Sequence, residues 1–146
     1  MRYLCKDHRK EFSRNPKQAA QSWQKIITRA RTLFHLEHWD QASVIYGNAF
    51  EIAEILLTNS QSQFSVDRYL RSALEFAYSL RKSQTPCDLE AFLPHVTQQL
   101  ARAKTKADLP YLTQPIEEVI KLPIHMADHW LTALLSLDAI EHRVLH

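Results

Sequence analysis

Hydrophobic residues recur every three or four positions along most of this chain, the spacing that places them on one face of an α-helix. The clearest case is residues 15–58, where two such runs are separated by a tight turn at residues 37–39. Because so short a connection joins only antiparallel neighbours, these residues are predicted to form a helical hairpin. Its apolar positions are Trp23, Ile26, Ile27, Ala30, Leu33 and Phe34 in the first helix and Ala42, Ile45, Tyr46, Ala49, Ile52, Ala53 and Leu56 in the second.

Short polar side chains indicate where these two helices begin. Asn15 is followed by Pro16, and a capping side chain with proline at the first helical position is typical of a helix start. Asp40 is expected to cap the second helix, because its carboxylate is able to accept hydrogen bonds from backbone N–H groups of the next turn.

The rest of the chain continues the helical pattern. A third helix is expected over residues 65–82, and a fourth is capped by Asp88 and either kinks or begins at Pro94. A short fifth helix is expected to open at Pro115, and a final helix follows Pro123.

This pattern predicts a single all-α domain over residues 1–146 with about six helices. We expect the helices to form antiparallel hairpins that stack as a short α-solenoid. The expected parts are a first hairpin at residues 15–58, a second and degenerate hairpin at 64–104, and a C-terminal hairpin or cap at 111–145.

The first hairpin resembles a tetratricopeptide repeat. Trp39, Ala42, Tyr46 and Ala49 follow the large–small–large–small spacing of the second helix in that family, and Ala30 takes the small position of the first. Small residues let two helices approach, while aromatic side chains fill the space beside them. The chain departs from the family in two respects: its second helix continues past the place of the usual closing proline, and no second copy follows about 34 residues later.

The resemblance implies a function and a surface. In that family the first helices of successive pairs line a concave surface that holds a peptide, so a non-catalytic adaptor or scaffold that binds a protein or peptide is expected. Arg31 would pair with a partner carboxylate, and the basic–asparagine pair of some family members is not reproduced. The surface residues by motif position are Gln24, Ile27, Arg31, Phe34 and His35, extended in the third helix by Arg71, Leu74 and Tyr78.

Composition excludes several other classes of protein. The chain has a single glycine, whereas phosphate-binding loops, dinucleotide fingerprints and nucleophile elbows all depend on glycine. Cys5 and Cys87 are too few for a disulfide framework and are expected to be reduced thiols. The apolar run at residues 130–137 is shorter than a membrane span. We therefore expect a cytoplasmic protein that has no membrane segment, no cofactor and no enzymatic activity.

Charge is unevenly distributed and suggests an alternative function. Residues 1–40 carry a balance of +5, whereas residues 107–146 carry −4, a polarity that favours association with a partner or head-to-tail self-association. The basic N-terminal positions, with Tyr3 and Phe12 among them, would suit a regulatory protein that binds nucleic acid. Acidic residues interrupt the run, so a solvated helix face is preferred. The basic residues are Arg2, Lys6, Arg9, Lys10, Arg14 and Lys17.

Histidine, glutamate and glycine positions complete the candidate chemistry. His125 and His129 lie one helical turn apart and form a weak candidate metal site, without an identifiable third ligand. Glu51 and Glu54 lack a histidine at the spacing of a di-metal site and are expected to face solvent. Gly47 indicates either close helix packing, which is preferred, or the seam of a homodimer.

Overall fold

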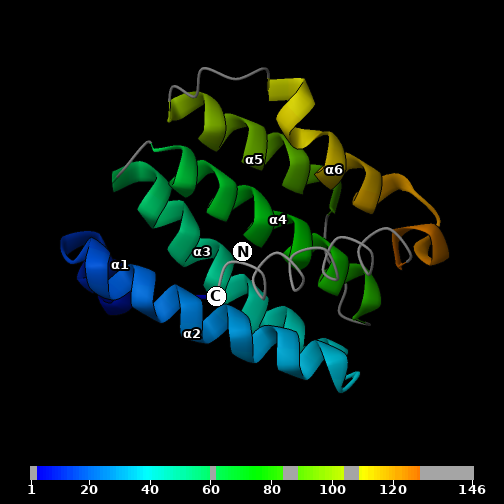
Figure 1. Cartoon of the computed structure of the whole chain (residues 1–146), viewed down its shortest axis with the longest axis horizontal. Coiled ribbons are helices and arrows are strands. Elements are labelled where there is room, and N and C mark those ends of the chain that lie inside the picture. The colour runs from blue at the N-terminus through cyan, green and yellow to red at the C-terminus, as the bar shows by residue number, and fades with distance from the viewer. Residues whose placement is uncertain (1–2, 60–61, 84–88, 104–108, 129–146) are drawn as a thin grey trace, which may run out of the picture.

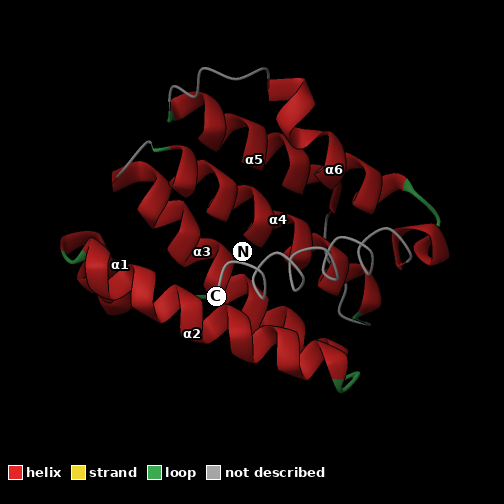
Figure 2. Ribbon diagram, viewed as in Figure 1, coloured by secondary structure: helices red, strands yellow, loops and turns green. Residues whose placement is uncertain are grey.

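The computed structural model describes residues 3–59, 62–83, 89–103 and 109–128, and these residues are almost entirely helical (Figures 1 and 2). Within these residues there is no strand, which confirms the predicted all-α class. A further helical turn follows at residues 124–128, and the rest of the predicted final helix lies outside the described residues. The helices are α1 (Lys6–Arg14), α2 (Pro16–His35), α3 (Trp39–Asn59), α4 (Gln63–Lys82), α5 (Leu89–Arg102) and α6 (Leu109–Lys121).

The first hairpin begins where the sequence predicts, but its second helix is not capped by Asp40. The Asn15 side chain caps α2 by accepting a hydrogen bond from the Gln18 backbone N–H at 3.2 Å. The prediction for Asp40 is wrong because α3 already begins at Trp39, which places Asp40 in its first turn. The early start follows from a tight turn: Glu37 takes a positive φ of 62°, and the His38 N–H donates to the Leu33 carbonyl at 3.0 Å.

Two later helix boundaries also differ from the prediction. α4 starts at Gln63, because the Ser62 hydroxyl caps it by accepting from the Ser65 N–H at 3.2 Å. The fifth helix does not open at Pro115, because α6 begins at Leu109 and Pro115 lies inside it. A proline inside a helix removes the hydrogen bond to the carbonyl four residues earlier. For Pro115 that carbonyl belongs to Tyr111.

The helices α2, α3 and α4 lie side by side and alternate in direction (Figure 1). Trp23 of α2 bonds Ser72 of α4, and the later Arg31 of α2 bonds the later Glu75 of α4. The order is the same along both helices, so α2 and α4 run parallel. On α3 the order is reversed, because Tyr46 bonds Glu75 while the later Glu54 bonds Tyr69. α3 is therefore antiparallel to α4.

The remaining helices cover the two sides of this layer. α1 packs against α2 and α3, while α5 and α6 pack against each other and against α4. Arg81 of α4 binds the C-terminal end of α6. Its Nη1 donates to the carbonyl of Val119 at 2.8 Å and to the carbonyl of Leu122. No helix within the described ranges is both long and apolar enough to cross a bilayer.

α4 is the central helix of the core. Residues 72–80 are buried at every position, because α3 covers one side of α4 while α5 and α6 cover another. Phe50 of α3 joins these layers, since its ring lies 5.2 Å from Tyr69, 5.5 Å from Phe76 and 5.2 Å from Phe92 of α5 (centroid distances). Aromatic pairs at these separations add to the stabilisation from buried area alone.

We expect Phe50→Ala to lower the free energy of unfolding by about 3–5 kcal/mol, because it leaves a cavity where three helices meet. Urea denaturation followed by circular dichroism measures this loss. Val44→Ala is the matched control on the same helix: Val44 is 49% exposed, so its truncation should change stability by less than about 0.5 kcal/mol. Equal losses for the two variants would contradict the assignment of Phe50 to the core.

Candidate functional site

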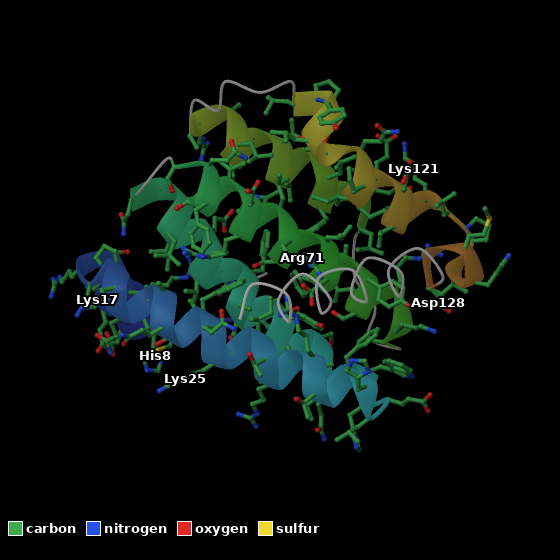
Figure 3. All side chains as sticks on the ribbon, viewed as in Figure 1. His8, Lys17, Lys25, Arg71, Lys121 and Asp128 are labelled. Atoms are coloured by element: carbon green, nitrogen blue, oxygen red, sulfur yellow. The ribbon has the colours of Figure 1, made fainter. Side chains whose placement is uncertain are left out.

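A stripe of basic and aromatic side chains runs along the face of α4 that meets α2. Its members are spaced three or four residues apart, so they share one helical face. Figure 3 shows Arg71 near the middle of α4, with Asp128 beyond the C-terminal end of that helix. The α4 stripe, as we call it, consists of Phe64, Arg68, Arg71, Glu75, Tyr78 and Lys82.

Glu75 lies at the centre of the stripe and binds side chains from three helices. The α2 residue Arg31 reaches both carboxylate oxygens, with Nε at 2.8 Å from Oε1 and Nη2 at 2.7 Å from Oε2. Arg71 Nε donates to Oε2 at 2.8 Å, and the Tyr46 hydroxyl of α3 donates to Oε1 at 2.9 Å. The Glu75 side chain is only 1% exposed, whereas Arg31 keeps 33% and Arg71 19% of its side chain exposed.

These contacts set the ionisation of the cluster. Burial by itself would raise the pKa of Glu75, but the hydrogen bonds and charges of the two arginines and the Tyr46 hydroxyl outweigh it and lower that pKa. Burial and the neighbouring carboxylate raise the pKa of Tyr46 well above its ordinary value, so its hydroxyl remains a donor. Glu75 is therefore a buried anion with two partly exposed cations around it.

An arginine stacked between aromatic rings forms the N-terminal end of the stripe. The Arg68 guanidinium carbon lies 4.6 Å from the Phe64 ring centroid and 5.5 Å from that of Trp23 on α2. Trp23 is itself held by its Nε1–H, which donates to the buried Ser72 hydroxyl at 2.8 Å. Burial lowers the pKa of Arg68, while Phe64 stays 68% exposed. This end therefore presents a charged group and an open aromatic surface together.

A lysine with aromatic neighbours forms the C-terminal end. Lys82 Nζ lies 5.2 Å from the Trp39 ring and 6.0 Å from the Tyr78 ring, and 3.0 Å from a carboxylate oxygen of Asp128. Burial raises the pKa of Asp128. Phe34 of α2 packs among these rings, with its centroid 4.8 Å from Trp39 and 5.2 Å from Tyr78. The two ends of the stripe thus repeat one arrangement, a cation held by aromatic faces.

The sequence-predicted surface residues divide into two groups. Arg31 and Arg71 are brought together at Glu75, and Gln24 and His35 are exposed on α2. The expected exposure of Ile27, Leu74 and Tyr78 is wrong: Ile27 is 0% exposed and the other two 4%. Their helical positions point into the contacts between α2, α3 and α4, where burial of apolar surface is favourable. Phe34 is half-buried in the aromatic cluster at the C-terminal end of the stripe.

Glu75 is the site residue that sequence reasoning missed. A signal for it exists, since it is the one charged residue in the otherwise uncharged and mostly apolar run from 72 to 80, one helical turn after Arg71. A carboxylate in such a run must be paired if the helix is buried. The sequence did not show that residues 72–80 of α4 are buried at every position, and this is the condition that makes the signal informative.

The prediction that Glu51 and Glu54 face solvent is wrong. Glu51 is 3% exposed and accepts the backbone N–H groups of Tyr3 at 2.8 Å and Leu4 at 2.6 Å. Glu54 accepts from the Tyr69 hydroxyl at 3.2 Å and contacts His95 of α5 at 2.6 Å. Both acids therefore join separate parts of the chain.

The candidate metal site and the basic N-terminal segment occupy other parts of the structure. His125 is exposed, and His129 lies outside the described residues. Across the described ranges, no group of three or more histidine, cysteine, aspartate or glutamate side chains is placed to hold a metal ion. In the basic segment, Arg9 is paired with Glu51 at 2.9 Å, whereas Lys6 and Lys10 are exposed.

A shallow hollow of about 600 Å³ lies on α6 and the residue that follows it. Its lining includes Tyr111, which is 74% exposed, and an ion pair between Lys121 and Glu117 at 2.8 Å. The two residues lie on adjacent turns of one helix, and such an ion pair stabilises a helix by about 0.5 kcal/mol or less. The α4 stripe, which gathers groups from α2, α3, α4 and the helical turn at residues 124–128 and buries a charge, is the stronger candidate site.

Comparison of the chain with protein-family models, curated proteins and solved structures finds no match.

We expect Glu75→Gln to lower the free energy of unfolding by about 3 kcal/mol, because it removes the anion that two arginines surround. Urea denaturation measures the loss. Glu117→Gln makes the same chemical change at a side chain that is 45% exposed, and it should cost less than about 0.5 kcal/mol. Equal stability of the two variants would contradict a central role for Glu75.

The stability difference between wild type and Glu75→Gln should depend on pH. Because the pKa of Glu75 is lower in the folded protein than its ordinary value of 4.5, its ionisation stabilises the fold above pH 4.5, and this stabilisation is lost as the pH falls below that value. The stability difference between wild type and Glu75→Gln should therefore be constant from pH 7 to 5 and should shrink below pH 4.5. A difference that stays constant down to pH 3 would contradict the lowered pKa.

Proposed function

We propose that this protein is a non-catalytic helical interaction module that binds an acidic segment of a protein partner along the α4 stripe. The observation that carries the proposal is the composition of that face. Together with Arg31 and Asp128, the described side chains of the stripe include four cations, Arg31, Arg68, Arg71 and Lys82, beside two carboxylates. Arginine and lysine beside aromatic rings offer a partner both charge-assisted hydrogen bonds and apolar contact.

The pre-organisation of these cations favours binding over a purely structural role. Arg68 is held between two rings and Arg31 by two hydrogen bonds, so neither must lose much side-chain freedom when a partner binds. The exposed fractions of Arg31, Arg71 and Phe64 leave these groups within reach of solvent. A carboxylate-bearing segment matches this surface in charge and an apolar residue beside it matches the rings.

The helix order supports a tetratricopeptide-like array as the scaffold of this module. α2 and α4 run parallel with α3 antiparallel to α4, and the face between α2 and α4 is the one that the resemblance assigns to a ligand. We propose that α2 and α3 form the first hairpin and that α4 opens a second, degenerate one. The small residues Ala30, Ala42 and Ala49 are fully buried, in keeping with the close helix approach that such a hairpin requires.

The length of the stripe defines a suitable probe. The helical rise from Phe64 to Lys82 is about 27 Å, which an extended peptide of about eight residues spans. We expect a fluorescein-labelled (Glu-Leu)4 peptide to bind the protein in fluorescence anisotropy, with affinity that falls as salt is added. A (Lys-Leu)4 peptide should not bind. Arg68→Ala should weaken binding about tenfold or more, because a hydrogen bond to a charged group contributes about 1.5–3 kcal/mol.

Arg29→Ala is the matched control, since Arg29 is an exposed arginine of α2 that lies outside the α4 stripe. It should leave the affinity unchanged. Equal binding of the acidic and basic peptides, or equal affinities for Arg68→Ala and wild type, would overturn the proposal. Binding of single-stranded oligonucleotide that is lost on Lys6→Ala and Lys10→Ala, but kept on Arg68→Ala, would instead favour the nucleic-acid alternative.

A further inference from the structure

A notch on α3 receives the N-terminal segment of the chain. Gly47 forms its floor, because a Cβ atom at this position would lie only 2.5 Å from Cδ2 of the Tyr3 ring. The Tyr3 ring also meets Phe76 of α4 edge to face, with 5.5 Å between centroids. Only glycine leaves room for an aromatic ring this close to a helix backbone. Gly47 therefore serves a close approach, although of a ring from the N-terminal segment and not of a neighbouring helix.

Glu51, one turn after Gly47, binds the backbone of the same segment. Its two carboxylate oxygens accept from consecutive backbone N–H groups, Oε1 from Tyr3 at 2.8 Å and Oε2 from Leu4 at 2.6 Å. Arg9 of α1 neutralises the carboxylate, with Nη2 at 2.9 Å from Oε1. Glu51 is 3% exposed with the segment in place, and departure of the segment would break both backbone hydrogen bonds to its carboxylate.

These contacts define the chemistry of the notch's occupant. The two N–H bonds recognise an extended backbone whatever its side chains, the glycine floor selects an aromatic ring, and the carboxylate selects a cation. The matching pattern is a tyrosine, an aliphatic residue directly after it, and an arginine six residues after the tyrosine. The segment is joined to α2 through the single residue Asn15 between α1 and α2. None of these groups belongs to the α4 stripe.

We propose that this notch is a peptide-recognition site that the chain's own N-terminal segment fills, and that a partner segment with the same tyrosine–aliphatic–arginine pattern competes for it. The tethered segment is present at a high effective concentration, so it lowers the apparent affinity for any partner. The apparent affinity equals the intrinsic affinity multiplied by the fraction of molecules in which the notch is open. Weakening the tethered segment should therefore raise the affinity for the partner segment.

The test uses the full chain and a labelled peptide that copies residues 1–14, with serine in place of cysteine. In fluorescence anisotropy, the Tyr3→Ala protein should bind this peptide at least about tenfold more tightly than wild type does, because its own segment fills the notch less often. A peptide with alanine in place of tyrosine should not bind. The double variant Tyr3→Ala with Gly47→Ala should not bind either, because the added methyl group fills the notch.

Equal affinities of wild type and Tyr3→Ala, or binding of the alanine peptide, would overturn the proposal. If Tyr3→Ala fails to fold, hydrogen exchange of the wild-type protein tests the proposal instead. The amides of Tyr3 and Leu4 should then exchange at least about a hundredfold faster than the Phe76 amide in the core, since the notch must open without global unfolding. Exchange of all three at one rate would show that the segment never leaves by itself.

Discussion

The buried carboxylate of Glu75 is the constraint on which the arrangement of the central helices depends. α2 and α4 touch mainly through long side chains, and the closest of these contacts is the pairing of Arg31 with Glu75. A charge that is 1% exposed tolerates no other placement of its partners, because each lost hydrogen bond leaves an uncompensated anion in the core. This pairing and the hydrogen bond from Trp23 to Ser72 therefore contribute to the register of α2 along α4.

The same physics connects the core to the surface. Glu75 is buried, whereas the two guanidinium groups that surround it, those of Arg31 and Arg71, are partly exposed. Tyr46 contributes a hydrogen bond without a charge, and its raised pKa keeps it in that role. The stabilising element of the fold and the proposed contact with an acidic partner are therefore parts of one cluster.

The sequence predicts the helices well and the polar contacts poorly. Helical spacing and the Asn15 cap placed α2, the turn and α3 correctly because these features are local. Glu51 was predicted to face solvent and Glu75 was missed. In both cases the partners lie far away in the sequence: residues 3–4 for Glu51 and Arg31 for Glu75. Ile27 and Tyr78 were placed on an open surface for the same reason: periodicity identifies a face but not what covers it. Arg31 and Arg71 were predicted to contact a partner, and the sequence did not indicate that both bind the buried Glu75.

The tight turn at residues 36–38 has a consequence for the speed of folding. Contacts between α2 and α3 close a loop of only a few residues, so this hairpin forms at little cost in chain entropy. The link from Arg31 to Glu75 spans 44 residues and can form only after α4 has docked. Chains dominated by local contacts fold quickly, within microseconds to milliseconds. We therefore infer that the hairpin is an early folding unit and that the charged link closes late.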